Sequence, residues 1–506
     1  MKKTLITAVI LFCSIIYAQD STRSLVVKNN FSSFTPIIKI KYPEFSISAG
    51  YYLVKSANEG NASSEHELAL RYLFGKGFEV DTAKAVYWIK KAVAQKLPAA
   101  CFNYGIMLLN QAGVEWNPFE AYKNFLIAAD KGMPEAEMLV GLFYLDNLII
   151  NKDINKAVEW IGKAAKAKYK PAEEVLAEVK TNEGRFIDLS AVTALPAVEK
   201  DVKEETGKDI SFEWAKNNKD TITASIEDVR EDDLLKKPYH TLKQFLNVKK
   251  SDFLEAKGDT TSAKLIQQAI KWGNPEAIML NGLSYEKGIS YKKDLIFAAS
   301  NYFRAYRLGI NRAANLLLKL ASENSFIDNL TKMMDKGDLE AVYVWSAIIA
   351  LNYNTRFTEE QSIEFLKKAS EKGHIQSMVE LGLCYYNGRG VAQDREKALE
   401  LWQKAADLGC EDARERIAFN SILTDSDKPA VKDNYEYLFK AYNNGSLLAE
   451  TAIAYCYEKG IVVKENKAEA NKIYRDAVKR GSEVAANSLK RMYDGLRPGG
   501  EEYKIY

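Results

Sequence analysis

The sequence predicts an all-α fold, an α/α superhelical solenoid of about eleven or twelve 36-residue helix-turn-helix repeats in two blocks. Small residues recur in steps of 36, and a glycine recurs eleven positions after most of them. Because one helix pair cannot bury its apolar face alone, this period indicates stacked repeats. The anchors are Ala49, Ala85, Ala121, Ala157, Ser262, Ala298, Ser362, Ala398, Asn434 and Ala470, and the glycines are Gly60, Gly132, Gly273, Gly309, Gly373, Gly409, Gly445 and Gly481.

The clearest repeat spans residues 377–413. Gly382 lies on the apolar face of its first expected helix and is small enough for a neighbouring helix to approach closely. Gly388 and Gly390 predict the turn, and Asp394 suits the cap of the second helix. Apolar residues at 3.6 periodicity, including Trp402, then form the inner stripe of that helix.

These positions carry a known repeat signature: a helix with small residues, a G-x-G turn, then D-x-x-K-A and W-x-x-K-A-A. It appears as Gly75, Gly77, Asp81, Lys84, Ala85, Trp88 and Ala92, and again as Asp153, Lys156, Ala157, Trp160, Ala164 and Ala165. The pattern resembles the Sel-like repeat (SLR) family, relatives of the tetratricopeptide repeats, over about four fifths of the chain. The resemblance implies a helical scaffold that acts as an adaptor.

Outside the repeats, the N-terminus has the layout of a secretory signal peptide. Lys2 and Lys3 precede an apolar run, Leu5–Ile16, and Ala18 precedes Gln19. We therefore expect an exported chain, periplasmic or at the cell surface, that begins at Gln19. The run is shorter than the roughly 20 residues of a membrane span, and no later segment is long and uncharged enough, so no transmembrane segment is expected after signal removal.

The period also divides the chain into segments. Repeats keep their register on both sides of residues 182–204, which contain neither anchor nor glycine turn, so a hinge or protruding element is expected there. Residues 205–238 fit a degenerate repeat only weakly. The expected segments are a signal peptide (1–18), an N-terminal arm (19–42), an N-terminal repeat block (43–181), an irregular insert or hinge (182–204), a C-terminal repeat block (205–496) and a loose tail (497–506).

Composition excludes several function classes. The chain has 70 Lys and Arg residues and 68 Asp and Glu residues. The net charge of +2 therefore does not indicate the basic surface that binds nucleic acid. The three histidines, His66, His240 and His374, have no metal-ligand spacing and are expected at the surface, and no nucleophile or phosphate-binding motif occurs. We therefore expect no enzyme, no catalytic residue, no metal and no cofactor. The four cysteines of the mature chain, Cys101, Cys384, Cys410 and Cys456, are expected as free buried thiols.

A stacked solenoid presents a curved surface lined by the first helix of each repeat. Positions that point away from the expected core stripe are candidates for a partner groove, although each could equally pack against the next repeat. They are Asn103, Met107, Phe143, Ser284, Glu380 and Asn387.

The function that follows is an exported scaffold that binds another protein or peptide in the cell envelope. Two alternatives stay open: a module that binds cell-wall glycan or peptide, and an envelope hydrolase, which would need a nucleophile and a base in one groove.

Overall fold

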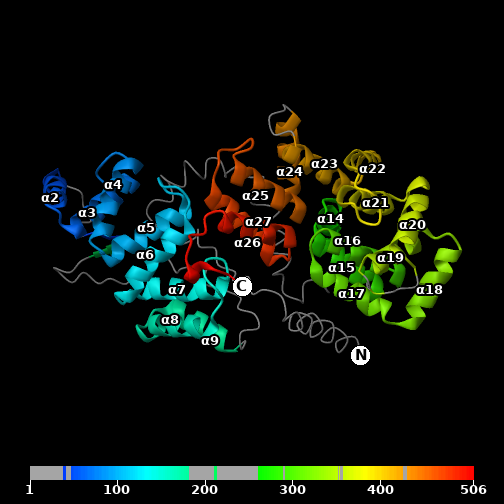
Figure 1. Cartoon of the computed structure of the whole chain (residues 1–506), viewed down its shortest axis with the longest axis horizontal. Coiled ribbons are helices and arrows are strands. Elements are labelled where there is room, and N and C mark those ends of the chain that lie inside the picture. Colours follow the sequence, from blue (N-terminus) through cyan, green and yellow to red (C-terminus); the bar gives the residue numbers. More distant parts are fainter. Residues whose placement is uncertain are drawn as a thin grey trace. The chain divides into compact units, whose positions relative to one another are not determined.

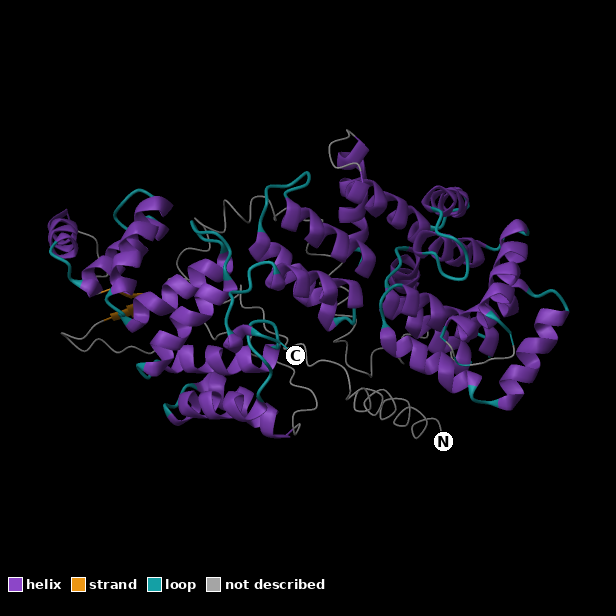
Figure 2. Cartoon of the chain, in the orientation of Figure 1, coloured by secondary structure: helices purple, strands orange, loops and turns teal. Residues whose placement is uncertain are grey.

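The computed structural model describes residues 38–40, 47–181, 210–212, 260–288, 291–351, 353, 357–424 and 430–505. Figure 2 shows that these residues are mostly helical, with loops between the helices, which confirms the all-α prediction. Two short strands, β1 (Ile38–Ile40) and β2 (Ile210–Phe212), pair antiparallel, with Lys39 opposite Ser211. The expected signal peptide and the expected hinge at 182–204 lie outside the described residues.

The chain divides into two compact units. The first comprises Met1–Arg230, Asn466–Asp476 and Asn487–Tyr506, and the second comprises Glu231–Glu465 and Ala477–Ala486. Two segments therefore differ from the expected blocks. Strand β2, expected in the C-terminal repeat block, belongs to the first unit, where it pairs with β1. Much of the C-terminal end also belongs to the first unit.

The first unit is built from antiparallel helix pairs (Figure 1). The cap residues expected from the repeat pattern are in place, since Asp81 accepts a hydrogen bond from the Lys84 backbone N–H and Asp153 from that of Lys156. The unit's consecutive helices are α2 (Ile47–Asn58), α3 (Ala62–Phe74), α4 (Thr82–Ala94), α5 (Pro98–Asn110), α6 (Pro118–Asp130), α7 (Pro134–Asp146), α8 (Ile154–Lys166) and α9 (Lys170–Thr181).

The second unit continues the same design. Its helices are α14 (Thr260–Lys271), α15 (Pro275–Lys287), α16 (Leu295–Arg307), α17 (Asn311–Ala321), α18 (Asn324–Asp335), α19 (Leu339–Ala350), α20 (Glu359–Glu371), α21 (Ile375–Asn387), α22 (Arg395–Asp407), α23 (Glu411–Thr424), α24 (Ala430–Asn443) and α25 (Leu447–Lys459).

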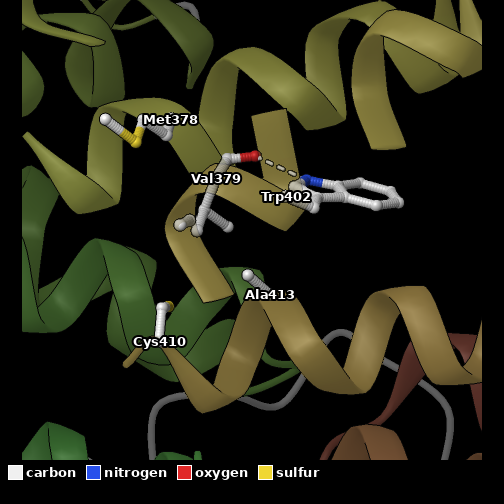
Figure 3. Packing of buried hydrophobic residues seen from close by; sticks show 6 residues of the cluster. Met378, Val379, Trp402, Cys410 and Ala413 are labelled. Carbon is white, nitrogen blue, oxygen red and sulfur yellow. Dashed lines mark hydrogen bonds between the residues drawn. The ribbon is translucent and has the colours of Figure 1, made fainter. Parts of the chain in front are cut away.

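In four of the described repeats, a glycine of the first helix packs directly against the second helix: Gly105, Gly141, Gly282 and Gly382. A Cβ at Gly282 would lie 2.7 Å from the ring of Tyr302, and one at Gly382 would collide with the indole of Trp402. In Figure 3 that indole donates from Nε1 to the Val379 carbonyl, 3.1 Å away, and it belongs to a packed cluster that also includes Met378. Glycine is therefore required because the facing aromatic side chain occupies the place of its Cβ.

Helices α17 and α18 form a shortened repeat, because only Ser322 and Glu323 separate them, whereas residues 388–394 separate α21 from α22. The preceding second helix, α16, packs directly against α19, and the rings of Phe303 and Tyr343 meet edge to face with centroids 5.5 Å apart. The shortened pair therefore leaves its two neighbouring repeats in contact with each other.

The C-terminal end contains α26 (Lys467–Lys479), α27 (Glu483–Asp494) and a 3-10 turn, η3 (Glu501–Tyr503). We expected a loose tail over 497–506, but Tyr503 is only 5% exposed and packs on Phe119. Arg497 donates hydrogen bonds to the carbonyls of Leu148 and Ile149. The tail is held because its tyrosine and arginine find partners on the N-terminal repeats.

The structure also bears on the predictions about the cysteines and about membrane-spanning helices. All four cysteines named above are free and buried, as expected. Within the described ranges, no helix is both long and apolar enough to span a bilayer.

Candidate functional site

The six residues predicted to line a partner groove lie on first helices of repeats: Asn103 and Met107 on α5, Phe143 on α7, Ser284 on α15, and Glu380 and Asn387 on α21. The structure does not bring them together on one open surface. Asn387 is exposed and Ser284 is half-buried, whereas Asn103, Met107, Phe143 and Glu380 are at most 1% exposed.

The buried four are taken up by contacts between repeats, the alternative considered above. The side-chain amide of Asn103 donates to His66 Nε2 over 2.8 Å, and Phe143 stacks on Phe125. Met107 is 1% exposed. These positions therefore stabilise the stacking of repeats and are not available to a partner.

Glu380 shows how a charged residue comes to be buried. Arg307 donates to both of its carboxylate oxygens, at 2.6 and 2.8 Å, and Arg389 donates to one of them at 2.5 Å. Burial acts to raise the pKa of Glu380, but the two guanidinium groups outweigh it and hold the pKa below its usual value. Glu380 is thus an ionised, doubly paired carboxylate.

The same unit repeats this arrangement at other positions. Arg304 forms a two-pronged pair with Asp412, with N–O distances of 2.7 and 3.0 Å. Arg480 binds Glu276 in the same way and also contacts Glu450. Arginine–carboxylate pairs therefore join helices that are distant in the sequence, and the repeat period contains no sign of them.

Glu415 is the exception among these buried acids. It accepts a hydrogen bond from the Ser446 hydroxyl at 2.5 Å, while its other oxygen, Oε1, has no hydrogen-bond partner in the described chain. Burial raises the pKa of Glu415 well above its usual value. The hydrogen bond from Ser446 lowers this pKa, whereas the nearby Asp412 charge raises it further. Burial and the Asp412 charge therefore favour the protonated form of Glu415.

The histidines were expected at the surface, and His66 corrects that expectation. It is 6% exposed, and burial lowers its pKa to about 4, so it is neutral and accepts from Asn103. His374 is partly buried, and His240 lies outside the described residues. The described residues contain no cluster of three or more His, Cys, Asp or Glu side chains that could hold a metal.

One contact resembles a hydrolase triad. Ser377 Oγ lies 2.7 Å from His374 Nδ1, and His374 Nε2 lies 2.9 Å from a carboxylate oxygen of Glu340. Ser377 is 0% exposed, and its backbone N–H also donates to the His374 ring, which caps α21. The group therefore caps a helix and offers no accessible nucleophile to a substrate.

An exposed aromatic group was missed by sequence reasoning. Tyr51 and Tyr52 on α2 and Tyr87 on α4 are 65%, 66% and 56% exposed, and both helices pack on α3. Tyr51 and Tyr87 are 36 residues apart, and the next residues in that register are Lys123 and Glu159. The available signal was thus a tyrosine at a position that other repeats fill with charge. We call these three residues the tyrosine surface.

Comparison with known proteins connects this architecture to a family. The chain is 25% identical over 193 residues to DAP3-binding cell death enhancer 1 of Mus musculus, covering 29% of this chain and 37% of that protein. It is 31% identical over 103 residues to the ERAD-associated E3 ubiquitin-protein ligase component HRD3B of Arabidopsis thaliana, covering 20% and 16%. The chain thus spans less than two fifths of the length of these curated relatives.

Solved structures give similar matches. A protective antigen of uropathogenic Escherichia coli with an SLR fold aligns over 88% of this chain and 83% of its own, at 18% identity and a TM-score of 0.31. A Sel1 repeat protein from Oxalobacter formigenes aligns over 26% and 98%, at 30% identity and a TM-score of 0.25.

The Sel1 repeat model matches seven segments of this chain: residues 62–97, 98–133, 134–169, 275–310, 359–374, 375–410 and 447–482. The anchors Ala85, Ala121, Ala157, Ala298, Ala398 and Ala470 all fall inside these segments. The chain belongs to the family of Sel1-repeat proteins.

Proposed function

We propose that this chain is an exported scaffold that binds another protein or peptide in the cell envelope through the tyrosine surface. Proteins with Sel1 repeats mediate protein–protein interaction, and one relative is named for binding DAP3. The export part of the proposal is supported by the charged and apolar residues that precede Ala18.

The observation that carries the binding proposal is the exposure of Tyr51, Tyr52 and Tyr87. Tyrosine is enriched in protein interfaces because its ring buries a large area and its hydroxyl forms a hydrogen bond at the edge. Three tyrosines more than half exposed on two helices of adjacent repeats therefore provide rigid anchors. Lys91, which also pairs with Glu65, lies 5.6 Å from the Tyr87 ring centroid and places a positive charge beside that tyrosine.

The test is affinity capture with the mature chain, 19–506, from envelope extracts, compared with a variant carrying Tyr51→Ser, Tyr52→Ser and Tyr87→Ser. The unaltered chain should capture the partner, and the variant should capture at least tenfold less of it. Tyr353→Ser, at a tyrosine 44% exposed in the second unit, serves as the control and should retain the partner. A partner held equally by all three proteins would exclude the tyrosine surface.

N-terminal sequencing of the secreted or periplasmic protein tests export separately. The sequence should begin at Gln19 or within a few residues of it. Intact protein that starts at Met1 in the cytoplasm would contradict this part of the proposal.

A glycan-binding role is the second candidate, since exposed tyrosine rings also stack on sugar faces. Sedimentation of the mature chain with purified cell-wall polymer distinguishes the two functions. Co-sedimentation that depends on Tyr51 and Tyr87, without any captured protein, would favour the glycan. We propose no catalytic role, because the serine–histidine–carboxylate contact described above is enclosed in a helix cap.

A further inference from the structure

We propose that the first unit carries a second binding site, specific for a peptide segment that presents arginine and tyrosine, and that the chain's own C-terminal end is its built-in occupant. We call it the Asp146 surface. It consists of Gln111, Trp116, Phe119 and Asp146 with the backbone carbonyls of Leu148 and Ile149.

The centre of this surface is a fully buried ion pair. Arg475 donates from Nη1 and Nη2 to the two oxygens of Asp146, at 2.8 and 2.5 Å, and both side chains are 0% exposed. Arg475 also donates to the Tyr493 hydroxyl at 2.9 Å, and that hydroxyl donates to Asn471. A two-pronged pair of this kind is selective for arginine, because lysine cannot donate along two parallel directions.

Aromatic residues surround the pair. The Tyr493 ring meets that of Trp116 edge to face at 5.3 Å, and Tyr503 meets Phe119 in the same way at 5.6 Å. The guanidinium of Arg497 lies 5.3 Å from the centroid of the Phe119 ring. The Asp146 surface therefore accepts two arginines and two tyrosines, which defines the chemistry of the segment it fits.

Two features separate this arrangement from ordinary repeat stacking. First, Arg497 donates to two successive carbonyls of the loop after α7, and it lies outside the seven segments that match the Sel1 repeat. Second, Trp116 is 3% exposed, yet its Nε1 donor has no hydrogen-bond partner among the described residues. The C-terminal segment leaves this donor unused, so a segment with an acceptor at that point would complement the surface better.

The tethered segment has an advantage of concentration. An attached ligand competes at an effective concentration in the millimolar range, so a free segment of equal affinity displaces it only at similar concentrations. A partner whose groups complement the surface better displaces the attached segment at a lower concentration. This inference goes beyond the proposed function and does not use the tyrosine surface, so the two proposals fail independently.

The test uses the full chain and a fluorescein-labelled peptide of residues 467–506, which contains Arg475, Tyr493, Arg497 and Tyr503, read by anisotropy. The double variant Arg497→Ala, Tyr503→Ala, which weakens the attached segment, should bind the peptide at least tenfold more tightly than the unaltered chain. Adding Phe119→Ala should return binding to the original level. Lys504→Ala, an exposed change in the same segment, is the matched control and should leave binding unchanged. Equal affinity of the double variant and the unaltered chain would overturn the proposal.

A second measurement needs no variant. Unlabelled peptide 467–506 at several millimolar should speed hydrogen exchange of the chain's own residues 487–505 and leave α21 and α22 protected. Unchanged protection of residues 487–505 at saturating peptide would show that the segment is a fixed part of the fold and would also overturn the proposal.

Discussion

Two buried carboxylates, one in each unit, are paired with arginine differently. In the first unit, Arg475 and Asp146 form one pair, 0% exposed on both sides, in which Arg475 is the one cation that contacts the carboxylate among the described residues. In the second, Glu380 is shared between Arg307 and Arg389. Removing one cation leaves a buried charge unpaired in the first case and still paired in the second. The difference teaches that the Asp146 site depends on one arginine, whereas the Glu380 site divides the same task between two.

The largest expected effect breaks the single pair. Arg475→Ala leaves Asp146 buried without a cation and should lower the free energy of unfolding by about 3 to 5 kcal/mol. Arg307→Ala, the matched change in the second unit, should cost only about 1 to 3 kcal/mol, because Arg389 remains on Glu380. Urea unfolding followed by circular dichroism measures both. Equal losses would remove the distinction between the two units.

The next largest change in stability is expected from the packing at the repeat glycines. Gly382→Leu forces bulk into the indole of Trp402 and should destabilise by about 1 to 3 kcal/mol, with faster hydrogen exchange first in α21 and α22. Gly162→Ala in the first unit is the control, since a Cβ there meets nothing within 4 Å. It should stabilise α8 by up to about 1 kcal/mol. Exchange that changes only in distant repeats would contradict the role of Gly382.

The units should also respond to pH in opposite directions. The pKa of His66 falls to about 4 on folding from 6.5, so the unfolded chain binds the extra proton between these values. The stability that neutral His66 contributes is therefore complete above pH 6.5 and lost as pH falls towards 4, by about 1.4 kcal/mol per pH unit. The pKa of Glu415 rises on folding from 4.5, so its contribution is complete below pH 4.5 and lost as pH rises through the folded pKa.

Single substitutions separate these two slopes. His66→Gln should flatten the pH dependence of the first unit between pH 4 and 6.5, and Glu415→Gln should flatten that of the second above pH 4.5. Hydrogen exchange at several pH values, followed for α3 and for α23, reports each unit. Unchanged slopes in the variants would assign the pH dependence to other groups.

The smallest effect concerns Val462. It has a φ of 64° and occupies the register of Gly390, whose φ is 66°. A β-branched residue is strained there, so Val462→Gly should stabilise the second unit by roughly 0.5 to 1 kcal/mol, since relief of strain exceeds the added chain entropy. Val80→Gly, at an exposed valine without positive φ, should give no gain. Thermal unfolding measures both.

The sequence predicted the parts of the fold that repeat. Gly382 and Trp402 were placed correctly because their spacing recurs, and a recurring spacing reports a recurring contact. Glu380 was expected on an open surface, because its helical phase points away from the core stripe. Its cation Arg307 lies 73 residues earlier, and a period of 36 carries no information about that encounter.

The two candidate sites differ in how visible they were. Tyr51 and Tyr87 share a register position, so their exposure could have been inferred from Lys123 and Glu159 at the same phase. Asp146 and Arg475 are 329 residues apart and follow no repeat rule. A one-dimensional pattern shows which face of a helix is apolar, but a contact between distant segments depends on how the repeats wind.

The 329 residues that separate Asp146 from Arg475 in the sequence determine how long Asp146 waits for its partner during synthesis. At roughly 5 to 20 residues per second, a ribosome needs about 16 to 66 s after Asp146 to reach Arg475. The nascent N-terminal repeats therefore emerge with a carboxylate, an indole and a phenyl ring still lacking their cover. During that interval they present the kind of incomplete surface that chaperones recognise, and truncated translation products would retain it.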